Sequence, residues 1–338
     1  MIFQVISGKM LAMNVLITGG AGYIGSHLAD RLLAQGAYVT VIDNLSSGLR
    51  ENVEHNAASP RYQFLEGTVM DQALMEELIS RHDLICHLAA IVGVQRVLSD
   101  PLRCIRHNVD GTQIVLALAH KHHRRVLFAS TSEIYGKSPQ APFAEDGDRL
   151  LGPTWVHRWA YATGKALDEH LCFGHLAKGL DVSIVRYFNS YGPRLDLGGY
   201  ASVIGQFVAQ AVRGQPLTVY DDGLQSRCFT YISDTVQGSF LAATKQQALG
   251  HAFNIGTDVE CTIVKLAKLI LRLSESRSDI VFRSYPSAYG PGFEDPRRRL
   301  PDTRKAEALL GFRAQVSLEE GLRRTIQWYR DSQLHNPV

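Results

Sequence analysis

Short apolar runs alternate with longer segments of three- to four-residue apolar periodicity along the first 190 positions. The runs predict buried strands, and the periodic segments predict amphipathic helices between them. Strands that alternate with helices predict an α/β fold with a doubly wound parallel sheet. The expected strands span 13–18, 38–43, 62–66, 84–89, 125–130 and 181–187, and the expected helices include 22–34, 71–80 and 108–120.

The pattern changes after position 190, where helical segments are mixed with short strands. We expect a smaller mixed α/β lobe over 191–338 that mainly binds substrate, after a dinucleotide-binding domain over 13–190. Residues 1–12 form an expected disordered leader, and 137–157 a long loop. Helices are expected over 203–213, 235–247, 263–274, 303–310 and 317–332, and strands over 217–220, 252–255 and 280–283.

The composition describes an ordinary globular chain and excludes several function classes. The 338 residues are 45% hydrophobic and 20% charged, and the net charge of +2 gives no reason to expect nucleic acid or a membrane surface as partner. No apolar run approaches the ~20 residues of a membrane span. The five cysteines have no metal-ligand spacing, so we expect free thiols, no metal site and a cytoplasmic location.

A glycine-rich turn follows the first expected strand and precedes the first expected helix. Gly19, Gly22 and Gly25 form a G-x-x-G-x-x-G variant of the dinucleotide fingerprint, with Tyr23 and Ile24 inside it. The first two glycines allow the backbone to turn tightly near a pyrophosphate, and Gly25 allows the helix to pack close to the strand. This motif predicts a Rossmann domain.

Asp43 ends the second expected strand, eighteen residues after Gly25. A carboxylate there accepts hydrogen bonds from the adenosine ribose and repels a 2′-phosphate. Asn44 follows instead of an arginine, so NAD is the expected cofactor. The alternative for Asp43 is a strand-end residue that caps a turn.

Two further segments are candidates for the cofactor site. Leu88, Ala89 and Ala90 end the fourth strand, where small residues allow a cofactor to lie close. Asn108 opens a long expected helix, and it either holds that helix at the cofactor or caps it.

Tyr161 and Lys165 are four residues apart, a spacing that places both on one face of a helix. An ammonium group there is expected to lower the pKa of the phenol, so that it acts as a base near neutral pH. Thr131, Ser132 and Glu133 follow the fifth strand, and the two hydroxyls can hold a substrate hydroxyl beside Tyr161.

These motifs together resemble one enzyme family. GGAGYIG, HLAA, STSEIYG, YATGK, VRYFNSYGPR and DGLQSRCFTYISD are similar to the extended short-chain dehydrogenases/reductases that act as nucleotide-sugar epimerases, dehydratases and decarboxylases. The resemblance spans residues 13–329. It implies NAD, a UDP-sugar substrate, Tyr161 as base, Lys165 as its partner at the nicotinamide ribose, and Thr131 or Ser132 at the sugar.

The resemblance also implies roles in the second half. Asn189 is expected at the sugar diphosphate and Arg227 at the nucleotide or its phosphates. The alternatives are that Asn189 closes a turn and that Arg227 belongs to a surface ion pair. A homodimer is expected through a four-helix interface made by the helices that carry Asn108 and Tyr161.

The family oxidises C4 of the sugar, and the 4-keto sugar is then epimerised, decarboxylated or dehydrated. The dehydratases have an Asp-Glu pair where this chain has Ser132 and Glu133, so dehydration is disfavoured. Thr-Ser-Glu, the segments 158–161 and 287–295, and Arg299 resemble UDP-glucuronate decarboxylases, in which the arginine aligned with Arg299 lies at the sugar. In UDP-glucuronate 4-epimerases, the arginine aligned with Arg194 holds the carboxylate.

On this basis we expect a 4-epimerase acting on UDP-glucuronate or UDP-glucose, with UDP-glucuronate decarboxylation as the alternative. A third possibility of another class is an NAD(P)-sensing regulator without catalysis. Such a regulator can lose the base, whereas Tyr161 and Lys165 are both present here.

Overall fold

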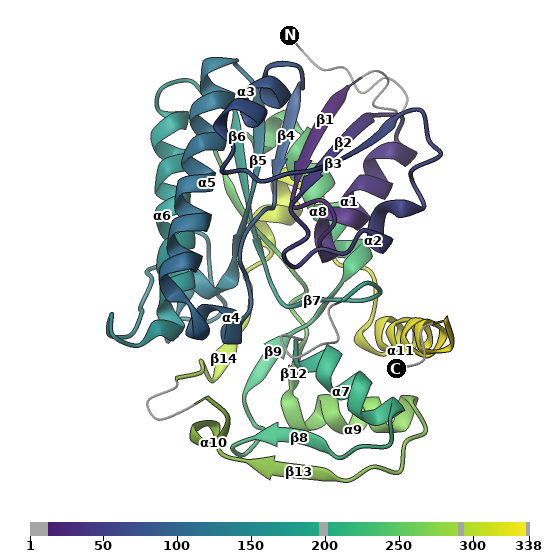
Figure 1. Cartoon of the computed structure of the whole chain (residues 1–338). Helices are drawn as coiled ribbons and strands as arrows, with labels where there is room; N and C mark the ends of the chain where they lie inside the picture. Colours follow the sequence, from purple (N-terminus) through teal and green to yellow (C-terminus); the bar gives the residue numbers. More distant parts are fainter. Residues whose placement is uncertain (1–12, 196–201, 290–293, 336–338) are drawn as a thin grey trace.

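The alternating strands and helices fold, in a computed structural model, around a seven-stranded parallel sheet with helices on both faces (Figure 1). The structure describes residues 13–195, 202–289 and 294–335, so the expected leader 1–12 lies outside the described residues. The doubly wound Rossmann architecture predicted from the sequence is confirmed.

The strand order is β11-β6-β5-β4-β1-β2-β3, and every pair in this sheet is parallel. One strand differs from the prediction, because residues 252–255 were expected in the C-terminal lobe and instead form the edge of the central sheet beside β6. The strands are β1 (Asn14–Thr18), β2 (Tyr38–Asp43), β3 (Tyr62–Glu66), β4 (Leu84–His87), β5 (Arg125–Thr131), β6 (Val182–Tyr187) and β11 (Ala252–Ile255).

Two groups of helices bury the two faces of the sheet. One face packs against α1 (Tyr23–Ala34) and α8 (Ile232–Thr244), with α2 (Glu51–Glu54) beside α1. The other packs against α3 (Gln72–Ser80), α5 (Pro101–Lys121) and α6 (Ala160–Leu176). None of the described helices is both long enough and apolar enough to cross a membrane.

Helix α5 begins seven residues earlier than the pattern predicted. Asp100 accepts a hydrogen bond from the Arg103 amide at 2.9 Å, and Pro101 occupies the first helical turn. Both are strong helix-start signals. The first turns expose Leu102 and Ile105, so their apolar periodicity does not mark a buried face.

The second lobe lies below the carboxyl ends of the central strands (Figure 1). In its three-stranded sheet, the middle strand β9 pairs with β12 on one side and β14 on the other, and this register sets Arg299 opposite Arg227. Its strands are β8 (Leu217–Tyr220), β9 (Ser226–Cys228), β12 (Glu260–Thr262), β13 (Ile280–Arg283) and β14 (Arg298–Arg299). Its helices are α7 (Val203–Val212), α9 (Ile263–Leu273) and α10 (Tyr285–Tyr289).

The remaining elements are short or peripheral. They are α4 (Val94–Ser99), the 3-10 turns η1 (Ser132–Tyr135), η2 (His157–Trp159) and η3 (Gln246–Ala248), the paired strands β7 (Ser190–Tyr191) and β10 (Thr230–Tyr231), the π-helical turn η4 (Ala306–Leu310), and α11 (Leu318–His335).

Candidate active site

A cavity of about 940 Å³ opens at the carboxyl ends of β1, β2, β4 and β5. This is the edge of a doubly wound sheet at which ligands bind. The cavity brings together nearly all the residues predicted from the sequence, whereas Asn108 and Arg227 do not line it. The predicted residues that line it are Gly19, Gly22, Tyr23, Ile24, Gly25, Asp43, Asn44, Leu88, Ala89, Ala90, Thr131, Ser132, Glu133, Tyr161, Lys165, Asn189, Arg194 and Arg299.

The glycine turn forms a cradle that side chains would fill. Gly19 has φ +70°, and a Cβ added there would lie 2.7 Å from the Ala89 nitrogen. A Cβ on Gly25 would meet the Gly19 carbonyl oxygen. Gly22 precedes α1 without a side-chain cap, so the first amides of that helix are free to bind an anion. The turn therefore fits the pyrophosphate of a dinucleotide.

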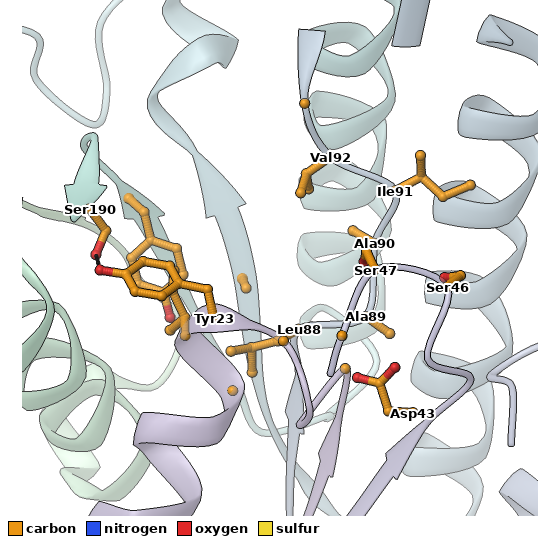
Figure 2. Close-up of a pocket in the computed structure, with 18 of the residues that line it drawn as sticks. Tyr23, Asp43, Ser46, Ser47, Leu88, Ala89, Ala90, Ile91, Val92 and Ser190 are labelled. Atoms are coloured by element: carbon orange, nitrogen blue, oxygen red, sulfur yellow. Dashed lines mark hydrogen bonds between the residues drawn. The ribbon is translucent and has the colours of Figure 1, made fainter. Parts of the chain in front are cut away.

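Asp43 lies at the end of β2, beside the glycine turn (Figure 2). Its Oδ2 accepts a hydrogen bond from the Ala21 amide at 3.0 Å, and its Oδ1 accepts one from the Leu45 amide at 2.9 Å. Burial raises the pKa of this carboxyl. Asp43 thus caps the turn and also lines the cavity, where its remaining lone pairs can accept from ribose hydroxyls.

The segment after β4 forms a second side of the cavity, and Figure 2 shows Leu88, Ala89, Ala90 and Ile91 along it. Asn108 binds both backbone groups of Ile91: its Oδ1 accepts from the amide at 2.7 Å, and its Nδ2 donates to the carbonyl at 3.0 Å. Asn108 therefore fixes the loop that lines the cavity. It does not cap α5, because that helix begins at Pro101.

Tyr161 and Lys165 both line the cavity from α6. Burial raises the pKa of Tyr161 above its ordinary value, and the charge of Glu133 raises it further, while a hydrogen bond with Thr131 lowers it. The Lys165 Nζ donates to the Ala129 carbonyl at 3.1 Å and lies 3.6 Å from Asp168, so the ammonium is held by these groups.

Hydrogen bonds to neighbouring protein groups fix the hydroxyl residues at the end of β5. Ser130 Oγ donates to Glu169 at 2.5 Å, and Glu169 is ion-paired with Arg186 at 2.7 Å. Thr131 Oγ1 accepts from the Glu133 amide at 3.2 Å and opens the turn η1. Thr131 and Ser132 therefore line the cavity beside Tyr161 on a rigid support.

Glu133 belongs to a buried charge cluster. Arg158 donates to its Oε2 at 2.6 Å, and the Nη1 of Arg299 lies 3.8 Å from its Oε1. Arg227 donates to Asp295 at 2.6 Å, and Asp295 lies 4.0 Å from Arg158. Three guanidiniums thus face two carboxylates, which leaves one positive charge unmatched.

The cluster has clear electrostatic consequences. Burial raises the pKa of Glu133, but the charges of Arg158 and Arg299 outweigh it and hold the pKa below its usual value. Burial lowers the pKa of Arg299 to about 10, which leaves the guanidinium charged at neutral pH. Arg299 is the guanidinium of this cluster that lines the cavity.

The two predicted residues after β6 have structural partners. Asn189 Nδ2 donates to the Cys228 carbonyl at 3.0 Å, so Asn189 closes a turn while it also lines the cavity. Arg194 lines the cavity as well, but its Nη2 is 2.8 Å from Asp30 of α1.

Sequence reasoning missed several residues of this region, among them Thr68, Val69, Arg158 and Asp295. Thr68 and Val69 line the cavity just after β3, and the rule that ligands bind at the carboxyl ends of strands would have indicated them. Arg158 was noted only as part of a motif, and Asp295 only as part of a tail. Their place in the charge cluster depends on a contact between distant parts of the chain.

The model of the NAD-dependent epimerase/dehydratase family matches residues 15–256. The chain belongs to this family. Several relatives that match most of this chain are named as decarboxylases. UDP-N-acetyl-alpha-D-glucosaminuronate decarboxylase of Bacillus cytotoxicus is 44% identical over 94% of this chain and 97% of its own. UDP-glucuronic acid decarboxylase 1 of Xenopus tropicalis is 37% identical over 95% of this chain and 73% of its own.

Solved structures of the NAD-dependent epimerase/dehydratase family agree with the fold and the cofactor. UDP-glucose 4-epimerase of Thermotoga maritima, solved with UDP-glucose, has a TM-score of 0.86 and 32% identity, covering 95% of this chain and 99% of that one. UDP-glucose 4-epimerase of Thermus thermophilus, solved with NAD, has a TM-score of 0.81 and 30% identity, covering 94% of this chain and 99% of that one. The cofactor of this chain is NAD.

Proposed function

We propose that this protein is an NAD-dependent decarboxylase of a UDP-hexuronate, either UDP-glucuronate or its 2-acetamido counterpart. The names of the two decarboxylase relatives support this choice. The sequence alone favoured a 4-epimerase with decarboxylation as the alternative, and the proposal reverses this preference. The structural neighbours keep epimerisation as the second candidate.

The unmatched positive charge at Arg299 is the observation that carries the proposal. An excess of buried positive charge is costly, so the cluster is suited to a ligand that brings a negative charge. Arg299 is 6% exposed and lines the same cavity as Tyr161 and Glu133. Glu133 is an electrostatic neighbour of Tyr161 and lies 3.8 Å from Arg299, so a sugar with O4 at Tyr161 would carry its C5 carboxylate on the side of this cluster.

The arginine expected to act in an epimerase has a carboxylate partner of its own. Arg194 pairs with Asp30 through Nη2, which also lies 3.4 Å from His55, whereas its buried Nη1 has no hydrogen-bond partner among the described residues. Arg299 instead lies in the lobe strand β14, beside Glu133. The excess positive charge therefore lies at Arg299, and this position supports the decarboxylase alternative over the epimerase.

The proposed reaction uses the lining residues in order. NAD, when bound, supplies the hydride acceptor at C4. Tyr161 takes the proton of O4, and Thr131 orients that hydroxyl. The sugar is then a β-keto acid, whose C5 carboxylate leaves as carbon dioxide with its bonding electrons passing to the 4-keto group. A proton is returned to C5, and reduction of C4 would give a UDP-pentose.

Dehydration fits the site poorly. Loss of water across C5 and C6 needs an acid that protonates the leaving hydroxyl. Ser132 stands where the dehydratases carry an Asp, and Arg158 and Arg299 hold the pKa of Glu133 low. Glu133 is therefore ionised at neutral pH and is a poor proton donor.

We also infer a homodimer through α5 and α6. These helices pack side by side on one face of the sheet (Figure 1). Their exposed side chains include Leu102, Ile105, Leu167 and Phe173. Apolar residues on two neighbouring helices fit the four-helix interface expected from the sequence.

The five free thiols fit the reducing cytoplasm that the sequence also suggested.

The proposal is tested by incubating the NAD-loaded protein with UDP-glucuronate, UDP-N-acetylglucosaminuronate or UDP-glucose and following products by proton NMR. We expect a UDP-pentose or its 4-keto form from a hexuronate, with an equivalent of carbon dioxide. Conversion of the hexuronate to its 4-epimer with the carboxylate retained would establish the epimerase. Turnover of UDP-glucose alone would rule out both hexuronate activities.

A further inference from the structure

Asp168 is a buried carboxylate that the proposed chemistry leaves unexplained. It lies on α6, three residues after Lys165, and is 0% exposed. Among the described residues, neither of its oxygens has a partner at hydrogen-bonding geometry. Buried polar groups are nearly always satisfied, and a buried charge needs a counter-ion.

Lys165 is the cation that faces this carboxylate. Its Nζ is 3.6 Å from Asp168 Oδ2, and Lys165 is 3% exposed. The same Nζ donates to the Ala129 carbonyl at 3.1 Å and lies over the Phe128 ring. The ammonium is therefore held between β5 and α6, with Asp168 as its buried anionic neighbour.

Among the described residues, the other groups around Asp168 do not supply a second free cation. Arg186 of β6 is ion-paired with Glu169, the neighbour of Asp168 in the chain, at 2.7 Å. His87 of β4 is neutral near pH 7, because burial and the charge of Lys165 lower its pKa to about 3. The titratable or hydroxyl groups that face the pair are Tyr161, Glu169 and Cys172 on α6, Cys104 and Thr112 on α5, and His87 on β4.

We propose that Asp168 is a positioning residue that acts through Lys165: its buried carboxylate holds the catalytic ammonium at the cavity wall. The inference applies to any reaction that uses the Tyr161–Lys165 pair, so it does not depend on decarboxylation. In the described structure, Asp168 itself does not line the cavity.

The charge of Asp168 beside Lys165 is expected to change with pH. Burial raises the pKa of Asp168 to about 6, although Lys165 and Thr112 lower it. The charge of Asp168 also raises the pKa of Tyr161. Above about pH 6 the Lys165 ammonium therefore has a charged partner, and below it the partner is neutral.

Infrared spectroscopy of the cofactor-free protein tests the pair without turnover. We expect the carbonyl stretch of a protonated carboxyl to appear with a midpoint near pH 6 and to be absent from Asp168→Asn. Lys165→Met should move this midpoint upward, because the ammonium then no longer opposes the effect of burial. A band unaffected by Asp168→Asn, or a midpoint unmoved by Lys165→Met, would overturn the proposal.

Kinetics test the positioning role. Asp168→Asn should lower kcat about tenfold or more with little change in KM, since small misplacements of catalytic groups cost up to ~10² in rate. The acid limb of kcat/KM should move to lower pH, because a negative charge near Tyr161 is removed. Unchanged kcat and an unmoved limb would refute the role.

Asp234→Asn is the matched control. Asp234 is also a buried carboxylate, but it accepts hydrogen bonds from the Gln315 and Val316 amides in the other helical layer. This variant should lower the melting temperature and leave the pH profile in place. A shift of the profile equal to that of Asp168→Asn would show a general effect of destabilisation and would also refute the proposal.

Discussion

Replacement of Arg299 by methionine should weaken hexuronate binding selectively. Arg299 is buried, lines the cavity and has only a partial ion pair with Glu133 at 3.8 Å, so its guanidinium has donors left for a substrate carboxylate. Hydrogen bonds to charged groups contribute about 1.5–3 kcal/mol. The expected loss in affinity for UDP-glucuronate is therefore about tenfold to a hundredfold, at about 1.4 kcal/mol per factor of ten.

The assay is isothermal titration of the NAD-loaded variant with UDP-glucuronate and, separately, with UDP-glucose. UDP-glucose lacks the carboxylate, so its affinity should change by less than about threefold. Arg298→Met serves as the control, because Arg298 precedes Arg299 in β14 but is exposed and paired with Glu260. If Arg299→Met weakened both ligands equally, Arg299 would not bind the carboxylate, and the proposed function would lose its main support.

Three further predictions concern the base, the cofactor and the assembly. Tyr161→Phe should lower turnover by ~10²-fold or more while NAD stays bound, as general-base catalysis contributes about 10²–10⁴; near-normal turnover would exclude that role. Asp43→Ser should narrow the preference for NAD over NADP in binding titrations, and an unchanged ratio would mean that Asp43 does not reach the ribose. The double variant Leu167→Glu and Phe173→Glu should be monomeric by light scattering, whereas a persisting dimer would place the interface elsewhere.

Much of the fold could be predicted because each buried strand is a short apolar run with its own boundaries. Within the central sheet the exception is β11, whose residues 252–255 pair with β6 after the chain has passed through the second lobe. An apolar run indicates that a strand is buried, but it does not indicate which sheet buries it. Topology at that point depends on the packing of α8 against α1, far away in sequence.

The cofactor side of the site was predictable for a related reason. Its residues follow the ends of consecutive strands, and parallel strands bring those ends to one edge. The charge cluster was not predictable, because Arg158 and Asp295 meet only when the second lobe folds over the sheet. The direction of the Lys165 ammonium also depends on tertiary contacts, with Ala129 and Asp168, rather than on helical spacing.

In the proposed reaction, the position of Glu133 beside Arg299 accounts for a site that both binds a carboxylate and lets it leave as carbon dioxide. Arg158 and Arg299 keep Glu133 ionised, so its charge weakens the field that Arg299 presents to a ligand. A carboxylate bound there is attracted by the excess positive charge of the cluster and repelled by the nearby Glu133. The attraction favours binding of the hexuronate, whereas the repulsion falls when the carboxylate leaves as neutral carbon dioxide. A clamp made of arginine alone would stabilise the bound carboxylate more than the departing one and would slow its loss.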